Sequence, residues 1–169
     1  MIGEFVKGKV YVFIDAANIF YSQRTLKWRI SYERLKQYLE GECDVQKIFI
    51  YTATDAGRPN QNKFIQMLEK NGFTVRTKPV KQIRISNGVY QWKGDFDVEL
   101  TMDMLDHINN YDSAILLSGD SDFAPIINRV KSHSKRVIVM SVKGHVSKEL
   151  LDRAKYMNLK KLRNEIELK

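Results

Sequence analysis

Residues 115–123 read Ile-Leu-Leu-Ser-Gly-Asp-Ser-Asp-Phe, an aliphatic run that passes through a short polar turn into a new segment. A short apolar run bounded by turn residues is typical of a strand that is buried on both faces. Gly119 permits a sharp backbone turn after it, and the residues from Phe123 onward have helical spacing. The stretch therefore predicts a strand, a tight turn and a helix in succession.

The same succession recurs along the chain. Apolar runs rich in β-branched and aromatic residues predict strands at residues 10–15, 45–54, 73–78, 113–118 and 136–142. Helical spacing predicts helices at residues 31–40, 60–72, 97–109, 123–133 and 146–155. Alternating strands and helices predict an α/β fold with a central, mostly parallel sheet flanked by helices.

One segment breaks this alternation. Residues 80–86 and 89–93 flank the pair Asn87-Gly88, which is the strongest short-range signal for a β-hairpin. We therefore expect an antiparallel hairpin inserted before the helix that begins near Asp97.

Length and composition limit the class of protein. A chain of 169 residues with 43% hydrophobic content can bury one core and is short for two, so a single domain is expected. Cys43 is the lone cysteine and cannot form an intramolecular disulfide, which favours a reducing compartment and a cytoplasmic protein. No run approaches the roughly 20 apolar residues that a membrane span needs, so no membrane partner is expected.

The net charge of +8 is unevenly distributed. Residues 95–122 contain eight acids and no lysine or arginine, so the rest of the chain carries 28 basic and 12 acidic residues, a net +16. A basic body around an acidic patch favours a nucleic-acid partner, although a pI near 9.5 would also serve solubility alone.

Basic and aromatic residues are interleaved around the predicted hairpin. Proteins bind single-stranded nucleic acids through cations that contact the phosphates and aromatic faces that stack on the bases. The simpler alternative is a hairpin with a solvated basic face. The basic residues at 129–136 are expected to contact the same nucleic-acid strand as the hairpin does. The predicted nucleic-acid-binding residues are Arg76, Lys78, Lys81, Arg84, Tyr90, Trp92, Lys93, Arg129, Lys131, Lys135 and Arg136.

Carboxylates follow two of the predicted strands directly. In open parallel sheets the reactive crevice lies beyond the carboxyl ends of the strands, so Asp15, with Asn18 after it, and the pair Asp120 and Asp122 are the residues to inspect. Helix capping explains one such aspartate, but two close carboxylates repel each other unless a cation lies between them. Oxygen ligands of this type suit Mg²⁺ or Mn²⁺.

A second acidic segment opens the helix predicted from Asp97. Glu99, Asp103 and Asp106 share one face of that helix, and a solvated face is the expectation for Glu99 and Asp106. Residues 98, 102 and 105 form an apolar stripe on the same helix.

These stretches resemble the NYN domain family, the LabA-like group within the PIN-like nuclease superfamily. Its pattern Asp-x-x-Asn is matched by Asp15 and Asn18, and its Ser-Gly-Asp-x-Asp-Phe motif by residues 118–123. Its Lys-Gly-x-Asp-Val-x-Leu-x-x-Asp-Met stretch is matched with one additional residue, which puts Asp97 and Asp103 at the aspartate positions and makes Asp95 the insertion.

The resemblance implies a PIN-like three-layer sandwich over about residues 10–159, with a hairpin inserted. It also implies RNA cleavage at an acidic pocket that holds one or two Mg²⁺ or Mn²⁺ ions. The implied metal ligands are Asp15, Asp97, Asp120 and Asp122, with Asn18 and Ser118 placing the phosphate and Asp95 and Asp103 as second-tier candidates. The RNA target, the mode of cleavage and the oligomeric state, a homodimer included, stay open.

Other functions remain to be weighed. Haloacid-dehalogenase phosphatases and response-regulator receivers also place an aspartate after the first strand. The phosphatase needs a second acid at position 17, where Ala17 stands, and the receiver needs an aspartate at the end of its third strand, where Lys78-Pro79 stands. A nucleic-acid-binding module that retains the metal pocket without turnover is the remaining alternative.

Overall fold

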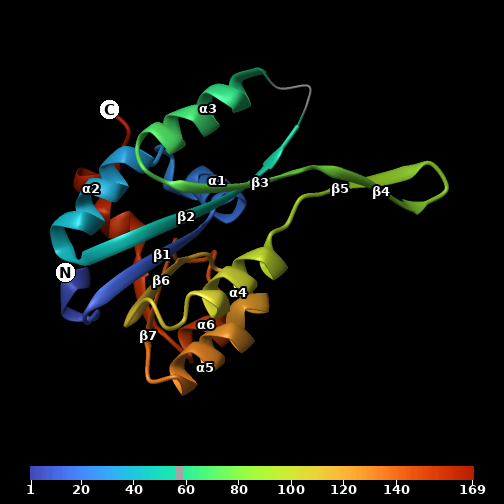
Figure 1. Ribbon diagram of the computed structural model, residues 1–169. Coiled ribbons are helices and arrows are strands. Elements are labelled where there is room, and N and C mark those ends of the chain that lie inside the picture. Colours follow the sequence, from blue (N-terminus) through green and yellow to red (C-terminus); the bar gives the residue numbers. More distant parts are fainter. Residues whose placement is uncertain (56–58) are drawn as a thin grey trace.

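The computed structural model describes residues 1–55 and 59–169, and it leaves the side chains of residues 59, 60 and 90–93 undescribed. Six parallel strands form one sheet in the order β3-β2-β1-β6-β7-β8 (Figure 1). Their bounds are β1 Lys9–Asp15, β2 Asp44–Thr54, β3 Thr74–Pro79, β6 Ser113–Leu117, β7 Arg136–Ser141 and β8 Lys155–Asn158. The predicted α/β fold with a parallel central sheet is confirmed.

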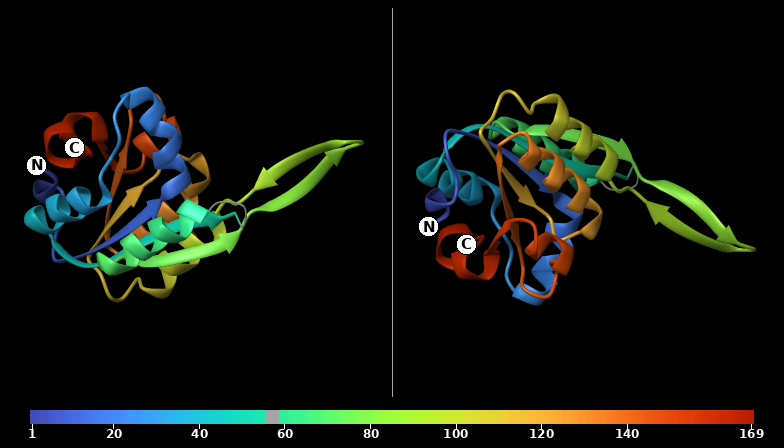
Figure 2. Two further views of the ribbon diagram at one scale, coloured as in Figure 1. Left: turned by 90° about the horizontal axis from the view of Figure 1, so that it is seen from above. Right: turned by 90° about the horizontal axis from the view of Figure 1, so that it is seen from below.

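Helices cover both faces of this sheet (Figures 1 and 2). One face packs against α1 (Ala16–Leu26), α2 (Tyr32–Glu42) and α3 (Pro59–Lys70), and the other against α4 (Asp97–Asp106), α5 (Ala124–Ser132) and α6 (Lys148–Leu151). Side chains alternate between the two cores along each strand, as in β1, where Val12 and Ile14 enter one core and Phe13 the other. Short elements complete the chain: η1 (Ile2–Glu4), η2 (Ser121–Phe123), η3 (Leu159–Leu162) and α7 (Arg163–Ile166).

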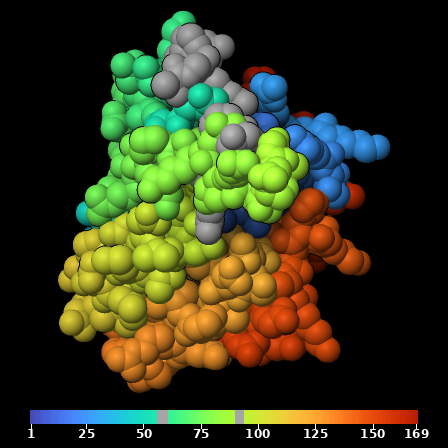
Figure 3. All heavy atoms as spheres, turned by 90° about the vertical axis from the view of Figure 1, so that its right-hand side faces the viewer, coloured from blue at the N-terminus to red at the C-terminus, as the bar shows by residue number. Residues whose placement is uncertain are grey.

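The predicted hairpin is present and projects from the domain (Figures 1 and 2). Its strands β4 (Lys81–Ser86) and β5 (Val89–Lys93) pair antiparallel, and Gly88 in the turn has a φ of +78°. Its base is fixed to the end of β2, because the Val80 N–H donates to the Thr54 carbonyl at 2.8 Å and a Cβ on Gly94 would lie 2.7 Å from that of Ala53. Figure 3 shows the hairpin standing over the end of the domain between α3 and α4.

The C-terminal part differs from the prediction. The helix expected at residues 146–155 is confined to α6: it starts after Ser147, whose side chain accepts the N–H of Leu150, and it ends at Leu151. The chain then returns to the sheet as β8, which the sequence analysis did not predict. Its four residues pair with β7 from Ile138 to Ser141, so the open edge of β7 supplies the partner that a short isolated run lacks.

Two further predictions need correction. Helix α1 was not predicted, although Ala16, Ile19 and Leu26 are buried at helical spacing. On α4 the buried residues are Leu100 and Met104, so the predicted apolar stripe at residues 98, 102 and 105 is exposed to solvent. Across residues 1–55 and 59–169, no helix combines the length and apolar character that crossing a membrane requires.

Candidate active site

The strand order reverses beside β1, and we call the place where the carboxyl ends of β1 and β6 meet the crevice, after its counterpart in open α/β sheets. The chain leaves β1 in one direction to form β2 and β3, and returns to the other side of β1 as β6. In open α/β sheets ligands bind outside the carboxyl ends of the strands at this reversal. Asp15 is the last residue of β1, and Ser118 follows β6 directly, so the two predicted acidic segments meet there.

Backbone geometry holds the acids that follow β6. Asp120 is the N-cap of η2, and its Oδ1 accepts the N–H of Asp122 at 3.0 Å. The Asp120 N–H lies 3.3 Å from the hydroxyl oxygen of Ser118. Gly119 packs directly on another loop, since a Cβ there would overlap the carbonyl oxygen of His145. Only glycine fits this close approach, and it fixes where Asp120 lies.

Asp15 accepts two hydrogen bonds, one at each carboxylate oxygen. Its Oδ1 accepts the N–H of Asn18 at 3.1 Å as the N-cap of α1, and its Oδ2 accepts the hydroxyl of Ser118 at 3.1 Å. Burial raises its pKa, and the nearby charge of Asp120 raises it further. These hydrogen bonds therefore hold the Asp15 carboxylate in one orientation at the crevice.

Asn18 joins the two loops. Its Oδ1 accepts the N–H of Gly119 at 3.1 Å, which ties the start of α1 to the turn after β6. We had expected Asn18 to place the phosphate. In the structure its carbonyl oxygen is used in this contact between loops, and the amide nitrogen is the part left to face a substrate.

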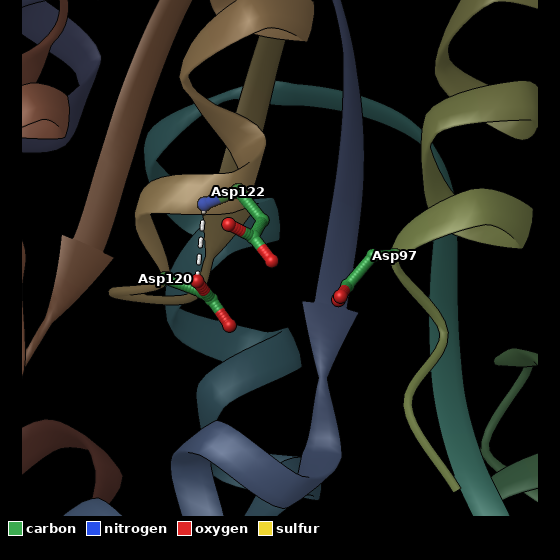
Figure 4. Close-up of side chains that lie close together, drawn as sticks. All are labelled: Asp97, Asp120 and Asp122. Atoms are coloured by element: carbon green, nitrogen blue, oxygen red, sulfur yellow. Dashed lines mark hydrogen bonds between the residues drawn. The ribbon is translucent and has the colours of Figure 1, made fainter.

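Asp97 reaches the same crevice from the start of α4. One carboxylate oxygen from each of Asp97, Asp120 and Asp122 lies within 4.8 Å of the others. Figure 4 shows Asp97 approaching from α4 and the other two from the segment after β6. Asp95 is exposed and is not among these three, so at the inserted position it is Asp97 that the fold brings to the acids.

The acids perturb one another. The pKa of Asp97 is raised to about 6, first by burial and then by the negative charges of Asp120, Asp95, Asp15 and Asp122. Since Asp15 contributes to that shift, it belongs to the same electrostatic group, although it lies outside the close set of three. Such a cluster is what a divalent cation would relieve.

Asp103 and Glu99 lie elsewhere on α4. Asp103 accepts the hydroxyl of Tyr51 at 2.9 Å and both Nε and Nη2 of Arg76, at 3.1 and 3.0 Å. Glu99 pairs with Lys78 at 2.7 Å, which lowers the pKa of that carboxyl. Glu99, which was expected to be solvated, therefore helps to hold α4 against β3, and Asp103 is engaged away from the three acids.

The predicted nucleic-acid-binding residues separate into groups. Arg76 and Lys78 are the cations of these two ion pairs, whereas Lys81 and Arg84 are exposed on the hairpin. The side chains of Tyr90, Trp92 and Lys93 lie outside the described residues. Those at 129–136 lie in the second half of α5 and at the start of β7, away from the crevice.

The sequence analysis missed one part of the site. The loop at residues 143–147 supports the turn after β6, where the Ser147 N–H donates to the Gly119 carbonyl at 2.9 Å. His145 in the same loop contacts Thr25 of α1, with Oγ1 and Nε2 2.6 Å apart. No motif marks these residues, because their role comes from packing against Gly119.

Comparison with known proteins gives the family. The NYN domain profile matches residues 9–160. The Low amplitude and bright protein LabA of Synechococcus elongatus is 30% identical over 167 residues, which are 96% of this chain and 90% of that protein. A crystal structure of a protein of unknown function from Vibrio parahaemolyticus is 27% identical, with a TM-score of 0.81 over 96% of this chain and 97% of that one.

Proposed function

The chain belongs to the NYN domain family, a PIN-like nuclease family, and from this premise we propose that it hydrolyses phosphodiester bonds in RNA with a divalent cation. The observation that carries the proposal is the convergence of Asp97, Asp120 and Asp122 at the end of the sheet where ligands of such folds bind.

The residues present fit a hard cation. All three side chains offer carboxylate oxygens within 4.8 Å of one another, which suits Mg²⁺ or Mn²⁺. Burial and the neighbouring carboxylates raise the pKa of Asp97 to about 6, and a bound cation would offset this cost. Asp97, Asp120 and Asp122 would hold the ion, with Asp15 as the fourth acid. A bound ion of this kind supplies a Lewis acid that polarises a phosphoryl oxygen and lowers the pKa of water.

The surrounding residues would orient the substrate. The amide nitrogen of Asn18 can donate to a phosphate oxygen while its carbonyl oxygen holds Gly119. Ser118 keeps the Asp15 carboxylate in one orientation through the hydrogen bond at 3.1 Å. Both residues fix the acids before substrate arrives, which is how a site reduces the reorganisation needed during reaction.

The hairpin would bring the strand to the acids. Only residues 94–96 separate the end of β5 from Asp97, so a nucleic-acid strand bound along the hairpin would extend to the crevice. Lys81 and Arg84 are exposed there and would contact phosphates. We propose RNA as the polymer and the cytoplasm as the location, and the lone cysteine suits that location.

Cleavage of end-labelled single-stranded RNA tests the proposal. The purified protein is incubated with Mn²⁺, Mg²⁺ or EDTA, beside Asp120→Asn and, as a matched control on α4, Asp106→Asn. We expect cleavage with either metal by the wild type and by Asp106→Asn, and a loss of at least about a hundredfold in Asp120→Asn or in EDTA. Cleavage that persists in EDTA would overturn the proposal, and RNA binding without any cleavage would support the binding-module alternative. Parallel reactions on DNA test the preference for RNA.

A further inference from the structure

A second charged surface lies where the strands begin. There an open depression of about 320 Å³ is lined by basic side chains and by Phe5. The basic residues are Lys131 in α5, Lys135 and Arg136 at the start of β7, and Arg153 and Lys155 around the start of β8. We call these five residues with Phe5 the amino-edge depression.

This depression is remote from the acids. The strands of the sheet are parallel, so their first residues lie on the side away from the hairpin and the crevice (Figure 1). At about 3.3 Å per residue, strands of four to six residues separate the two surfaces by on the order of 13–20 Å. The same ligand group cannot touch both surfaces at once.

Two of the cations are held by backbone carbonyls. The Lys131 Nζ donates to the carbonyl of Arg153 at 2.6 Å, and the Nη1 of Arg153 donates to the carbonyl of Glu149 at 2.7 Å. A carbonyl fixes the direction of a cation without neutralising its charge. These two side chains are therefore placed in advance for an anion.

Two more of the cations contact Phe5, one through its backbone carbonyl and one through its ring. The Nη1 of Arg136 lies 3.4 Å from the Phe5 carbonyl oxygen, and the Nζ of Lys155 lies 4.3 Å from the centroid of the Phe5 ring. An aromatic face attracts a cation but leaves its net charge in place. Within residues 1–55 and 59–169, no carboxylate is recorded in an ion pair with any of these four cations.

Among the described residues, one acid lines the depression and another forms an ion pair with one of its cations. Glu4 lines it and lies 3.2 Å from the amino group of Met1, and Asp112 lies 3.8 Å from the Nζ of Lys135. The depression thus keeps most of its positive charge. By contrast, Arg76 and Lys78 near the hairpin are paired directly with carboxylates at 3.0 and 2.7 Å.

The shape of the depression favours one class of anion. Its cations come from three elements and surround an open surface, which suits anions spaced along a chain better than one compact phosphate. Its apolar members Phe5, Val137 and Ala154 are partly or fully buried, so nothing there can insert into a lipid layer. Spaced phosphates on a chain are the anions that match.

We propose that the amino-edge depression binds the phosphate backbone of a nucleic-acid strand at a second site, separate from the acidic crevice. The site binds a part of the polymer other than the part that lies in the crevice, and its contacts do not depend on base identity. The inference concerns binding alone, so it stands or fails independently of cleavage.

The test measures binding of a fluorescently labelled single-stranded RNA by anisotropy in EDTA, where no metal-dependent cleavage occurs. The variant is Lys131→Gln with Lys155→Gln. The matched control is Lys63→Gln with Lys70→Gln, two exposed lysines on α3 that make the same change of net charge. Thermal unfolding of each variant verifies that it remains folded.

Each lost phosphate contact makes the negative slope of log affinity against log salt shallower by about 0.7 for a single-stranded nucleic acid. The slope of the depression variant should therefore be shallower by about 1.4. At 0.1 M salt this corresponds to affinity about 25-fold weaker, with the control close to the wild type. Equal weakening in both variants would show a general charge effect and would overturn the proposal. Unchanged binding by the depression variant would overturn it as well.

Discussion

The amide N–H of Gly119 donates to the Oδ1 of Asn18 at 3.1 Å, and together with the hydrogen bond from Ser118 to Asp15 this contact joins the two segments that carry the acids. Asn18 follows β1 and Gly119 follows β6, so the contact spans the point where the strand order reverses. The relative position of Asp15 and Asp120 therefore depends on it.

We expect Asn18→Ala to lower the free energy of unfolding by about 1–3 kcal/mol, because the buried N–H of Gly119 loses its acceptor. Chemical denaturation measures this. Asn71→Ala, which removes an exposed hydrogen bond to Met67, is the control and should change stability by under about 0.5 kcal/mol. Equal effects of the two substitutions would show that the loops are held by other contacts.

Gly119→Ala should destabilise the protein by about 3 kcal/mol, since the added Cβ would meet the carbonyl of His145 and force the two loops apart. Gly41→Ala is the matched comparison. Gly41 lies inside α2 with nothing within 4 Å, so alanine there should stabilise by about 0.5–1 kcal/mol. Denaturation midpoints of the two variants should move in opposite directions, and a tolerated Gly119→Ala would contradict the close approach.

The stability of the metal-free protein should depend on Asp97 and on pH. The pKa of Asp97 is raised from 3.8 to about 6, so its ionised form destabilises the folded state, and this part of the stability is lost as the pH rises from about 4 to above 6. In EDTA, Asp97→Asn should therefore match the wild type near pH 4 and exceed it at pH 7. Because Asp97 is half-buried, solvent screening limits the gain to about 1 kcal/mol.

Thermal unfolding across that pH range measures this difference. Asp106→Asn makes the same charge change on the same helix at an exposed position and should show no such pH dependence. A gain that is constant with pH, or a loss at pH 7, would contradict the repulsion inferred from the cluster.

Asp103→Asn should lower the stability of the fold without changing the affinity for Mn²⁺. The carboxylate accepts hydrogen bonds from Tyr51 and Arg76, so its replacement should cost about 1–3 kcal/mol of stability. Because Asp103 does not join the three clustered acids, Mn²⁺ affinity should stay within about twofold of the wild type. Isothermal titration with Mn²⁺ tests this, and a loss of affinity would return Asp103 to the metal site.

Much of the fold follows from local sequence signals. The apolar runs that form β1, β2, β6 and β7 are long enough to be recognised alone, β3 is marked by its β-branched residues after Phe73, and the pair Asn87-Gly88 marks the hairpin turn. Strand β8 was missed because its four residues are defined by the free edge of β7 and carry little signal of their own. Helix α1 was missed although its buried residues have helical spacing and Asp15 is its N-cap.

The candidate site was predictable only in part. Asp120 and Asp122 are close in sequence and follow a recognisable strand, but their meeting with Asp97 depends on how the start of α4 packs beside η2. The choice of Asp97 over Asp95 for this cluster is likewise a matter of packing. Which cations are neutralised could not be read from composition, since the partners Asp103 and Glu99 come from a helix that follows the hairpin.

Mn²⁺ binding tests the central claim most directly, through the loss of the free-ion signal in electron paramagnetic resonance. The metal-free wild type should bind at least one Mn²⁺, and Asp120→Asn combined with Asp122→Asn should weaken that binding by at least about a hundredfold, while Asp103→Asn binds as the wild type does. Equal Mn²⁺ binding by the wild type and by the double variant would contradict the claim that these carboxylates form a metal site.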